Sequence, residues 1–572
     1  MRKECWQGEA AVSWKEYGIW AVILLFIALL ASAPLFSADH ILHGYDLPVH
    51  LGRIEGLRDA LLSGQFPVRL NPVHLGGYGM PTDIFYPDVF LYFPALLRMA
   101  GMPLLACWKA YLVMVNLLTV FASWWAFAVY TRSVRAGAVA AMFYEVFLFR
   151  LVMLYVASAA ASILGMAFLP GALVAIWVTL HRDVSYWPAV VFFSTCILLS
   201  HIVTAVFLMA AMIIMVLVSF WRFAVPEVRW ATVKSAGFIF LLNLWFYAPL
   251  WYFQQHMDYM MKSVTHQEIN YSNIFYLREG DFYMGSGVLL ILAAACLYLF
   301  FHREKMHKRE FCLLMAGSAV ILFLISRPWP WHAVGHWAGL LQFPGRLTVF
   351  PMMFLAIVIA RGAEAFGLER WHHRLAVIVC LVAALGGNFL WMSGRTYSIP
   401  PQQRENQRLV IARSTVEDYL AHFDDTYSVF KDYMDVATYE HIMEAPVPVE
   451  DKDEKLRMKF RDRELHPADR IREVWRNSND FVLDYAAGPA EWVQLPLFWY
   501  IGYTASSPSK GRAYAVRRDE DGQVSVLLPS GEGRVHVWYG GLPWFHLTDI
   551  ISWFSLWGFL WYMGYERRRR EG

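Results

Sequence analysis

Long apolar segments constrain this chain more than any other feature of its sequence. The stretch from Tyr17 to Ser37 is nearly uncharged. It holds about 20 residues, which at about 1.5 Å of helical rise each would cross a hydrocarbon core about 30 Å thick. Comparable segments recur at residues 107–130, 136–153, 162–180, 186–201, 202–221, 231–252, 285–302, 311–326, 346–361, 373–393 and 547–564. The sequence therefore predicts a polytopic α-helical membrane protein with about 12 transmembrane helices.

The composition supports this setting and excludes several classes of protein. Hydrophobic residues make up 58% of the chain and charged residues 17%, against about 45–50% and about 25% in soluble domains. The net charge of +2 gives no sign of a nucleic-acid partner. The sequence has no P-loop and no GxGxxG phosphate cradle, which argues against a nucleotide-driven pump.

The distribution of basic residues predicts the orientation of the chain in the membrane. An even number of spans puts both termini on one side, and basic residues flank the first and last spans: Arg2, Lys3, Lys15 and Arg567 to Arg570. By the positive-inside rule, both termini are expected in the cytoplasm. The same alternation places the long connections 38–106, 253–284 and 394–546 on the extracytoplasmic face. The spans that meet at Ser200-His201 leave almost no loop, so one of them is expected to be short or re-entrant.

Three domains are expected. Residues 1–393 form a transmembrane domain whose first outer loop is 38–106. Residues 394–546 form an extracytoplasmic α+β domain, polar over 400–480 and rich in strands over 490–540, where a small antiparallel sandwich-like module is expected because apolar and polar residues alternate between glycine-bearing turns. Residues 547–572 form the last transmembrane helix and a basic cytoplasmic tail.

The first outer loop begins with a carboxylate, Asp46, immediately before a predicted helix over 47–62. That helix carries an apolar stripe that includes Leu51, Ile54 and Leu57, and its charged residues lie mostly elsewhere, so we expect it to lie along the membrane surface. Asp46 then has two interpretations. It is either a cap of this helix or a catalytic base at the lipid interface, able to accept a proton from a hydroxyl.

Five further residues of the loop are candidates for substrate binding. His50 either orients Asp46 or binds phosphate when protonated, or is incidental. Arg69 contacts an anionic head group or snorkels to lipid phosphate. His74 lies in a glycine-rich turn over 71–79. Asp83 and Asp88 bind a divalent cation or cap helices, which makes them weak candidates for a metal site.

Several short segments resemble bacterial YfhO-type membrane proteins, which belong with the GT-C glycosyltransferases. A similar, overlapping family is labelled as 6-pyruvoyl-tetrahydropterin-synthase-related membrane proteins. The segments that carry the resemblance run nearly end to end in the expected order: Tyr45-Asp46…His50, Gln65-Phe-Pro-Val-Arg69, Gly76-Gly-Tyr-Gly…Phe85-Tyr-Pro, Ser200-His-Ile-Val-Thr204, Leu341-Gln-Phe-Pro-Gly-Arg346 and Leu495-Pro-Leu-Phe-Trp-Tyr-Ile-Gly-Tyr503.

The resemblance implies transfer of a sugar from a polyprenyl-phosphate carrier to an acceptor on the outer face, such as a cell-surface glycan, teichoic acid or lipid. It also implies that a first-loop aspartate acts as the general base in a reaction that inverts the configuration at the anomeric carbon. Asp46 matches the position of that aspartate. Arg346 is the candidate for gripping the departing lipid phosphate, with a snorkelling anchor as its alternative. His201 is expected either to face the same volume as Arg346 or to be a packed residue at a helix end. The first loop lacks an adjacent acidic pair, which argues against dependence on a divalent cation unless Asp83 or Asp88 takes the place of that pair. No other cofactor is expected.

Two other functions remain open. A transporter or flippase for a lipid-linked sugar also needs many spans, and intramembrane ionisable groups would mark its path. A non-catalytic assembly scaffold would use the outer sheet as a docking module, and Asp46 would then be dispensable.

Overall fold

The computed structural model describes residues 14–36, 46–260, 308–325, 329, 344–366, 368, 370–396, 433–444, 455–456, 470–477, 480–509 and 511–571. The chain divides into two compact units. The first unit comprises residues 1–47, 109–239 and 265–400, and the second comprises 48–108, 240–264 and 401–572.

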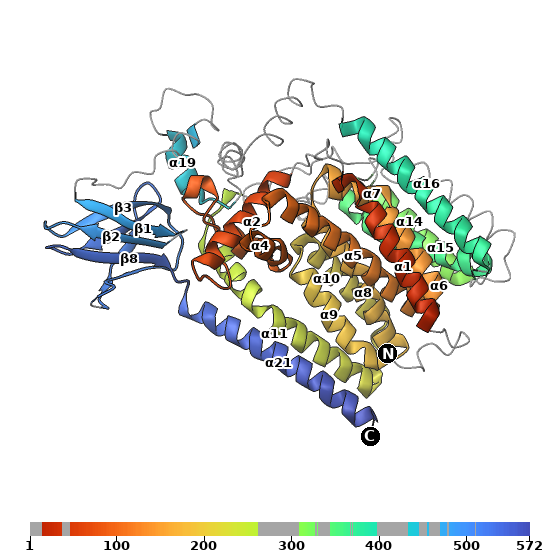
Figure 1. Ribbon diagram of the computed structural model, residues 1–572. Coiled ribbons are helices and arrows are strands. Elements are labelled where there is room, and N and C mark those ends of the chain that lie inside the picture. The colour runs from red at the N-terminus through yellow and green to blue at the C-terminus, as the bar shows by residue number, and fades with distance from the viewer. Residues whose placement is uncertain are drawn as a thin grey trace. The chain divides into compact units, whose positions relative to one another are not determined.

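The described part of the first unit is helical. Its helices are α1 (Trp14–Ala31), α6 (Val134–Val146), α7 (Leu148–Leu151), α8 (Ala160–His181), α9 (Trp187–Leu198), α10 (Ile202–Val218), α14 (Lys308–Leu324), α15 (Val349–Phe366) and α16 (Trp371–Thr396). α5 (Leu104–Thr131) and α11 (Pro226–His256) each begin in one unit and end in the other. Within the first unit, α6 packs against α1, α15 and α16, and α8 packs against α9 and α10 (Figure 1).

Apolar helices of membrane-spanning length are present, as predicted. Among the described residues, six helices are long and apolar enough to cross a membrane, or seven if one bent pair counts as a single span. Every predicted span within the described residues contains a helix, and the predicted span 285–302 lies outside them. The total of 12 spans stays a prediction. α9 has 12 residues, too few for a hydrocarbon core about 30 Å thick, which confirms the short helix expected beside His201.

The predicted span 136–153 is not one straight helix. Within it, α6 ends at Val146 and the chain continues at a bend of 49°. α7 follows, and then a π-helical turn, η5 (Val152–Val156). Phe147 separates the two helices with φ −55° and ψ 130°, an extended conformation that breaks the hydrogen-bond ladder of α6.

The described part of the second unit contains helices of 4 to 29 residues and a β-sandwich. Its helices are α2 (Leu47–Leu62), whose first residue belongs to the first unit, and α3 (Thr82–Phe85), α4 (Tyr92–Met99), α19 (Val436–Glu444) and α21 (Pro543–Glu571). Its strands are β1 (Ile471–Asn477), β2 (Asp480–Tyr485), β3 (Glu491–Phe498), β4 (Tyr503–Ser506), β5 (Ala513–Tyr514), β6 (Val516–Arg518), β7 (Gln523–Leu528) and β8 (Gly533–Tyr539).

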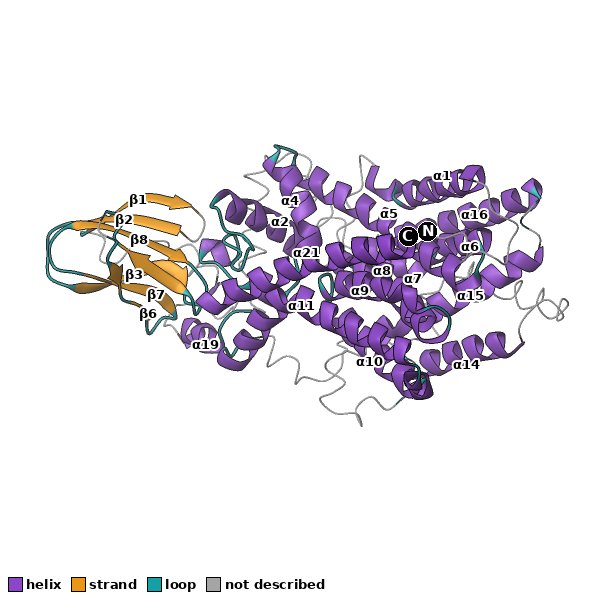
Figure 2. Ribbon diagram, turned by 90° about the horizontal axis from the view of Figure 1, so that it is seen from below, coloured by secondary structure: helices purple, strands orange, loops and turns teal. Residues whose placement is uncertain are grey.

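The strands form two antiparallel sheets, as the sequence predicted. One has the order β1-β2-β8-β4-β5 and the other β3-β7-β6 (Figure 2). Alternate residues of facing strands, such as Leu483, Val493, Val526 and Val537, are fully buried and form the core between the sheets. The predicted start of the strands at 490 is wrong, because β1 and β2 occupy part of the segment expected to be polar. β2 alternates buried residues with outward-facing ones such as Asp480 and Asp484, whereas β1 is exposed from Arg472 to Trp475. The charged residues of both strands made the segment read as polar in the sequence.

Candidate functional site

Asp46 is an exposed residue directly before α2. Its backbone N–H donates a hydrogen bond to the carbonyl oxygen of Ala157 at 3.0 Å, and both residues belong to the first unit. Its place before the helix fits the cap interpretation, and its exposure leaves the carboxylate accessible for the catalytic one. The hydrogen bond fixes the backbone that carries this carboxylate.

Ala157 lies in an irregular stretch between η5 and α8. Its N–H donates to Val152 O, and the N–H of Ala159 donates to Met153 O. Between them, Ser158 has a positive φ of 57°, a conformation that is uncommon for a residue with a side chain. Irregular turns of this kind cluster at functional sites, where the surrounding structure holds the strain.

His201 caps a helix. It is the residue before α10, and its Nδ1 accepts a hydrogen bond from the N–H of Thr204 at 3.2 Å. The imidazole is 4% exposed. This geometry matches the alternative of a packed helix-end residue, in which the ring satisfies one of the unpaired donors of the first helical turn.

Arg346 lies half-buried in a 3₁₀ turn, η11 (Pro344–Thr348), that leads into α15. Asp46, His201 and Arg346 all belong to the first unit, whereas His50, Arg69, His74, Asp83 and Asp88 belong to the second. The predicted site residues therefore separate into two groups, and their roles in substrate binding stay predictions.

Four members of the second-unit group, His50, His74, Asp83 and Asp88, lie near Arg53, whose positive charge acts on each of them. Arg53 is 1% exposed, and its Nη2 donates to the carbonyl oxygens of Tyr86 at 2.9 Å and Pro87 at 3.0 Å. The same nitrogen lies 3.4 Å from Asp83 Oδ1. Glu55, also buried, pairs with Arg98 at 2.5 Å. The helix 47–62 is confirmed. Two of its charged residues, Arg53 and Glu55, are buried by partners from α4 and from α3 and the loop after it.

Asp83 and Asp88 are both about 1% exposed. Burial raises the pKa of Asp83 to about 6, although contact with Arg53 acts in the opposite direction. Burial and then the neighbouring charge of Asp83 raise the pKa of Asp88 to about 8. Because Asp83 has the cationic partner, we assign the negative charge of the pair to Asp83 and a proton to Asp88 near neutral pH.

His50 and His74 are buried and neutral. Burial, followed by the positive charge of Arg53, lowers the pKa of each imidazole to about 3. His50 also stacks on Trp108 with ring centroids 5.5 Å apart. A neutral ring offers no positive charge to a phosphate, so in this conformation neither histidine supplies electrostatic binding of that kind.

Arg69 makes internal contacts rather than facing solvent. Its Nη2 lies 2.5 Å from Asp549 Oδ1 at the start of α21, and its Nη1 donates to Trp245 O on α11 at 2.9 Å. The side chain is 7% exposed. The guanidinium thus ties the first loop to two helices of the second unit, a structural role that the alternatives of head-group binding and snorkelling did not include.

The glycine-rich turn over 71–79 packs on the β-sandwich within the second unit. Phe498 N–H donates to Tyr78 O at 3.0 Å, and Arg476 Nη2 donates to Gly77 O at 2.8 Å. The rings of Tyr78 and Phe498 lie 4.8 Å apart. The sandwich therefore holds this part of the first loop through backbone carbonyls.

A divalent cation has limited support in the described part of the chain. There, no group of three or more His, Cys, Asp or Glu residues is placed to hold a metal ion. Asp83 and Asp88 alone supply two carboxyls, and the guanidinium of Arg53 already lies against one of them. The cation stays a prediction.

Two ionisable residues are buried inside the predicted span 136–153: Arg150, which the sequence offered only as a weaker candidate for binding phosphate or the acceptor, and Glu145, which it did not single out. Glu145 and Arg150 are both 0% exposed, and Glu145 Oε1 lies 3.1 Å from Arg150 Nη1 across the break between α6 and α7. The signal was present in the sequence, because two charges within an apolar segment are costly unless they pair. Their spacing of five residues gave no sign of the break.

Comparisons with known proteins give distant structural likenesses. No family model and no curated protein match the chain. The arabinofuranosyltransferase AftD from Mycobacteria is 16% identical, with a TM-score of 0.40, over 68% of this chain and 27% of AftD. The archaeal oligosaccharyltransferase AglB from Archaeoglobus fulgidus, in complex with an inhibitory peptide and a dolichol-phosphate, is 12% identical, with a TM-score of 0.35, over 77% of this chain and 59% of AglB.

A third solved structure is ArnT from Cupriavidus metallidurans bound to undecaprenyl phosphate. It is 15% identical, with a TM-score of 0.37, and the match covers 73% of this chain and 76% of ArnT. This chain spans little more than a quarter of AftD, the first of these structures. Because none of the TM-scores exceeds 0.40, this chain's own residues carry the proposals that follow. Membership of the YfhO-type family stays a prediction.

Proposed function

We propose that this chain is a membrane glycosyltransferase of the GT-C type. It transfers a sugar from a polyprenyl-phosphate-linked donor to an acceptor at the extracytoplasmic surface, with inversion at the anomeric carbon. The observation that carries the proposal is Asp46, an exposed residue whose backbone is hydrogen-bonded to the irregular stretch at Ala157. A carboxylate that is both accessible and held in place is what a general base requires.

The proposed reaction is a single displacement. The acceptor hydroxyl oxygen attacks the anomeric carbon while its proton passes to the Asp46 carboxylate. The bond between the anomeric carbon and the phosphate oxygen breaks, and its electron pair leaves with the polyprenyl phosphate. Arg346 is proposed to stabilise the negative charge that grows on this phosphate, since a guanidinium binds phosphate through paired N–H groups. Both residues belong to the first unit.

The acceptor class is a cell-surface glycan, a teichoic acid or a lipid, and the active site is proposed to face the extracytoplasmic side. The runner-up functions are a lipid-linked-sugar flippase and a non-catalytic assembly scaffold. The buried Glu145–Arg150 pair is the feature that a flippase would share. Neither alternative requires a proton acceptor at Asp46, so the same variant separates the transferase from both alternatives.

The test is an Asp46→Asn substitution, which keeps the size of the side chain and removes its basicity. We expect sugar transfer to fall at least about 100-fold, the scale of general base catalysis. The measurement is the sugar content of surface glycans, teichoic acids and lipids in cells that lack the native gene and express each variant at equal membrane level.

Asp59→Asn serves as the matched control. Asp59 lies on α2 and pairs with Arg58 at 2.7 Å on the partly exposed side of the helix, where an ion pair contributes about 1 kcal/mol or less. We expect this variant to transfer sugar at the wild-type level. Wild-type transfer by Asp46→Asn would overturn the assignment of the base and favour a scaffold or a flippase.

A further inference from the structure

The break after α6 leaves backbone carbonyls that need partners. Phe147 interrupts the helix, so the carbonyls of Glu145 and Val146 lose the N–H groups that an unbroken helix would supply. Arg150 Nη1 donates to Glu145 O at 3.2 Å, and Asn388 Nδ2 of α16 donates to Val146 O at 2.8 Å. Such replacement of lost hydrogen bonds is the condition under which irregular backbone is tolerated at membrane depth.

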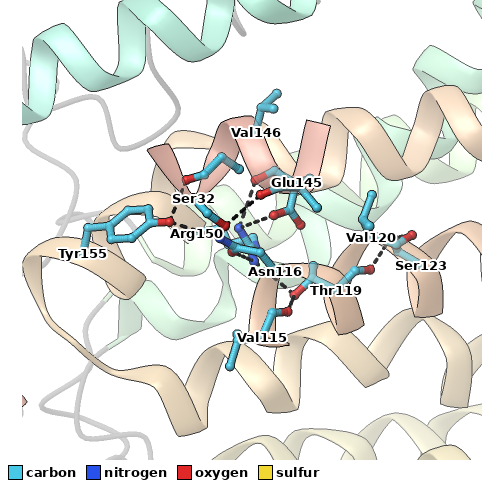
Figure 3. Close-up of polar contacts among 12 residues, drawn as sticks. Ser32, Val115, Asn116, Thr119, Val120, Ser123, Glu145, Val146, Arg150 and Tyr155 are labelled. Carbon is cyan, nitrogen blue, oxygen red and sulfur yellow. Dashed lines mark hydrogen bonds and ion pairs between the residues drawn. The ribbon is translucent and has the colours of Figure 1, made fainter. Parts of the chain in front are cut away.

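Arg150 also begins a chain of buried contacts that leads away from the break (Figure 3). Its Nη2 donates to Asn116 Oδ1 at 2.6 Å and to Thr119 Oγ1 at 3.1 Å, both on α5. Asn116 Nδ2 in turn donates to the hydroxyl of Tyr155 at 3.1 Å and to Ser32 Oγ at 2.8 Å. The oxygen and the nitrogen of the Asn116 side-chain amide therefore both have hydrogen-bond partners.

Tyr155 closes the chain. Its hydroxyl donates to Ala31 O at the end of α1 at 2.6 Å, and the side chain is 1% exposed. Tyr155 lies in the π-helical turn η5, two residues before Ala157. The Arg150 network, defined as Ser32, Asn116, Thr119, Glu145, Arg150 and Tyr155, therefore ties both ends of the irregular segment to α1 and α5.

We propose that the Arg150 network positions Asp46. It holds the segment from Phe147 to Ala157 in one conformation, and the carbonyl of Ala157 passes this constraint to the Asp46 N–H. Arg150, Asn116 and Tyr155 are thus positioning residues, which act on the reaction through the place of the base. The inference rests on the proposed function for its kinetic consequence, while its structural half concerns the Asp46–Ala157 hydrogen bond alone.

Tyr155→Phe is the variant that tests this inference, because it removes one hydroxyl and leaves the ring in place. Removing Arg150 instead would leave Glu145 without its cationic partner in a dry interior, which is strongly destabilising. Tyr144→Phe is the matched control. Tyr144 is also fully buried, on the other side of the same break, and its hydroxyl donates to Met166 O at 2.9 Å, outside the Arg150 network.

Two readouts on the full-length chain separate the inference from the proposed function. The first is hydrogen exchange of the Asp46 amide, which needs no substrate. We expect it to speed up about 10-fold or more in Tyr155→Phe and to stay unchanged in Tyr144→Phe. The second is transfer kinetics, in which we expect kcat of Tyr155→Phe to fall about 10-fold or more, because small misplacements of a catalytic group are costly. The KM for the lipid-linked donor should stay within about 2-fold of wild type, because the donor-binding groups are untouched.

The outcomes are distinct. Unchanged exchange at Asp46 in Tyr155→Phe overturns the inference, whatever the kinetics show. Faster exchange together with lower kcat at constant KM supports it, and equal losses in both tyrosine variants would indicate general destabilisation and overturn it. If Asp46→Asn retains full transfer, the proposed function fails, and the exchange experiment still decides whether the Arg150 network holds Asp46.

Discussion

Burial, more than residue type, decides which first-loop residues carry charge. His50, His74, Asp83 and Asp88 were candidates because such residues bind phosphates and cations when exposed. The structure surrounds them with apolar groups and with Arg53. This environment keeps the two imidazoles neutral and the carboxyl of Asp88 protonated near neutral pH. The Tyr92 hydroxyl accepts a hydrogen bond from Val68 N–H at 3.0 Å and lies beside the carboxyl of Asp88, which burial keeps protonated near neutral pH.

This protonation predicts that stability falls as pH rises from about 6.5 to 8. The pKa of Asp88 is raised from 3.8 to about 8 on folding, so the folded state holds a proton that the unfolded chain has released. A state that binds more protons loses stability as pH rises. His50 and His74, with pKa values lowered from 6.5 to about 3, act in the opposite direction, but only below about pH 6.5. The expected loss is about 2 kcal/mol.

Asp88→Asn should remove this dependence, because the amide resembles the protonated carboxyl and has no proton to lose. The measurement is the melting temperature of the full chain in detergent at pH 6.5 and 8. Asp484→Asn is the control, since Arg534 lowers the pKa of that exposed carboxyl and it does not titrate in this range. A wild-type melting temperature that is equal or higher at pH 8 would contradict the assignment of the proton to Asp88.

At the scale of elements, apolar patterns predicted helices well and their interruptions poorly. The stripe through Leu51, Ile54 and Leu57 predicted α2 with its observed bounds, because local periodicity alone determines which face is apolar. The break at Phe147 has no proline or glycine to mark it. It depends on Arg150 and on Asn388, a residue 242 positions away from the carbonyl that it satisfies, and no local pattern contains that information.

The helices α5 and α6 pack closely against each other at Gly137. Gly137 lies in a run of small residues on α6, as helices that pack closely in membranes require. A Cβ atom at Gly137 would lie 2.4 Å from the backbone nitrogen of Ala128 on α5. Backbone cannot move aside as a flexible side chain can, so the two helices would have to separate.

Gly137→Ala is therefore expected to destabilise the protein by about 1–3 kcal/mol, the usual cost of overpacking. The check is the melting temperature of the purified chain. Gly386→Ala is the matched control, because Gly386 lies within α16 and a Cβ there meets nothing within 4 Å. Alanine should be neutral or slightly stabilising at that position, where it is the better helix former. Equal effects of the two substitutions would show that α5 and α6 are not so closely packed.

At the scale of the whole molecule, the distribution of charge predicts which parts of the chain face outward. Basic residues before α1 and at the end of α21 predict cytoplasmic termini, and the same alternation puts the β-sandwich outside. Within the second unit, the sandwich contacts the glycine-rich turn of the first loop through Gly77 and Tyr78. The two segments must then share a side of the membrane, which agrees with the outward assignment of both 38–106 and 394–546.

Single cysteines test this topology directly. Ser509, in the loop between β4 and β5, and Arg569, near the end of α21, are both exposed. In intact cells, a membrane-impermeant maleimide should label Ser509→Cys, whereas Arg569→Cys should react only after the membrane is permeabilised. The wild-type chain gives the background from its native cysteines. Labelling of Arg569→Cys before permeabilisation would reverse the orientation or change the parity of the spans, and in the reversed case it would place Asp46 on the cytoplasmic side, away from an extracytoplasmic acceptor.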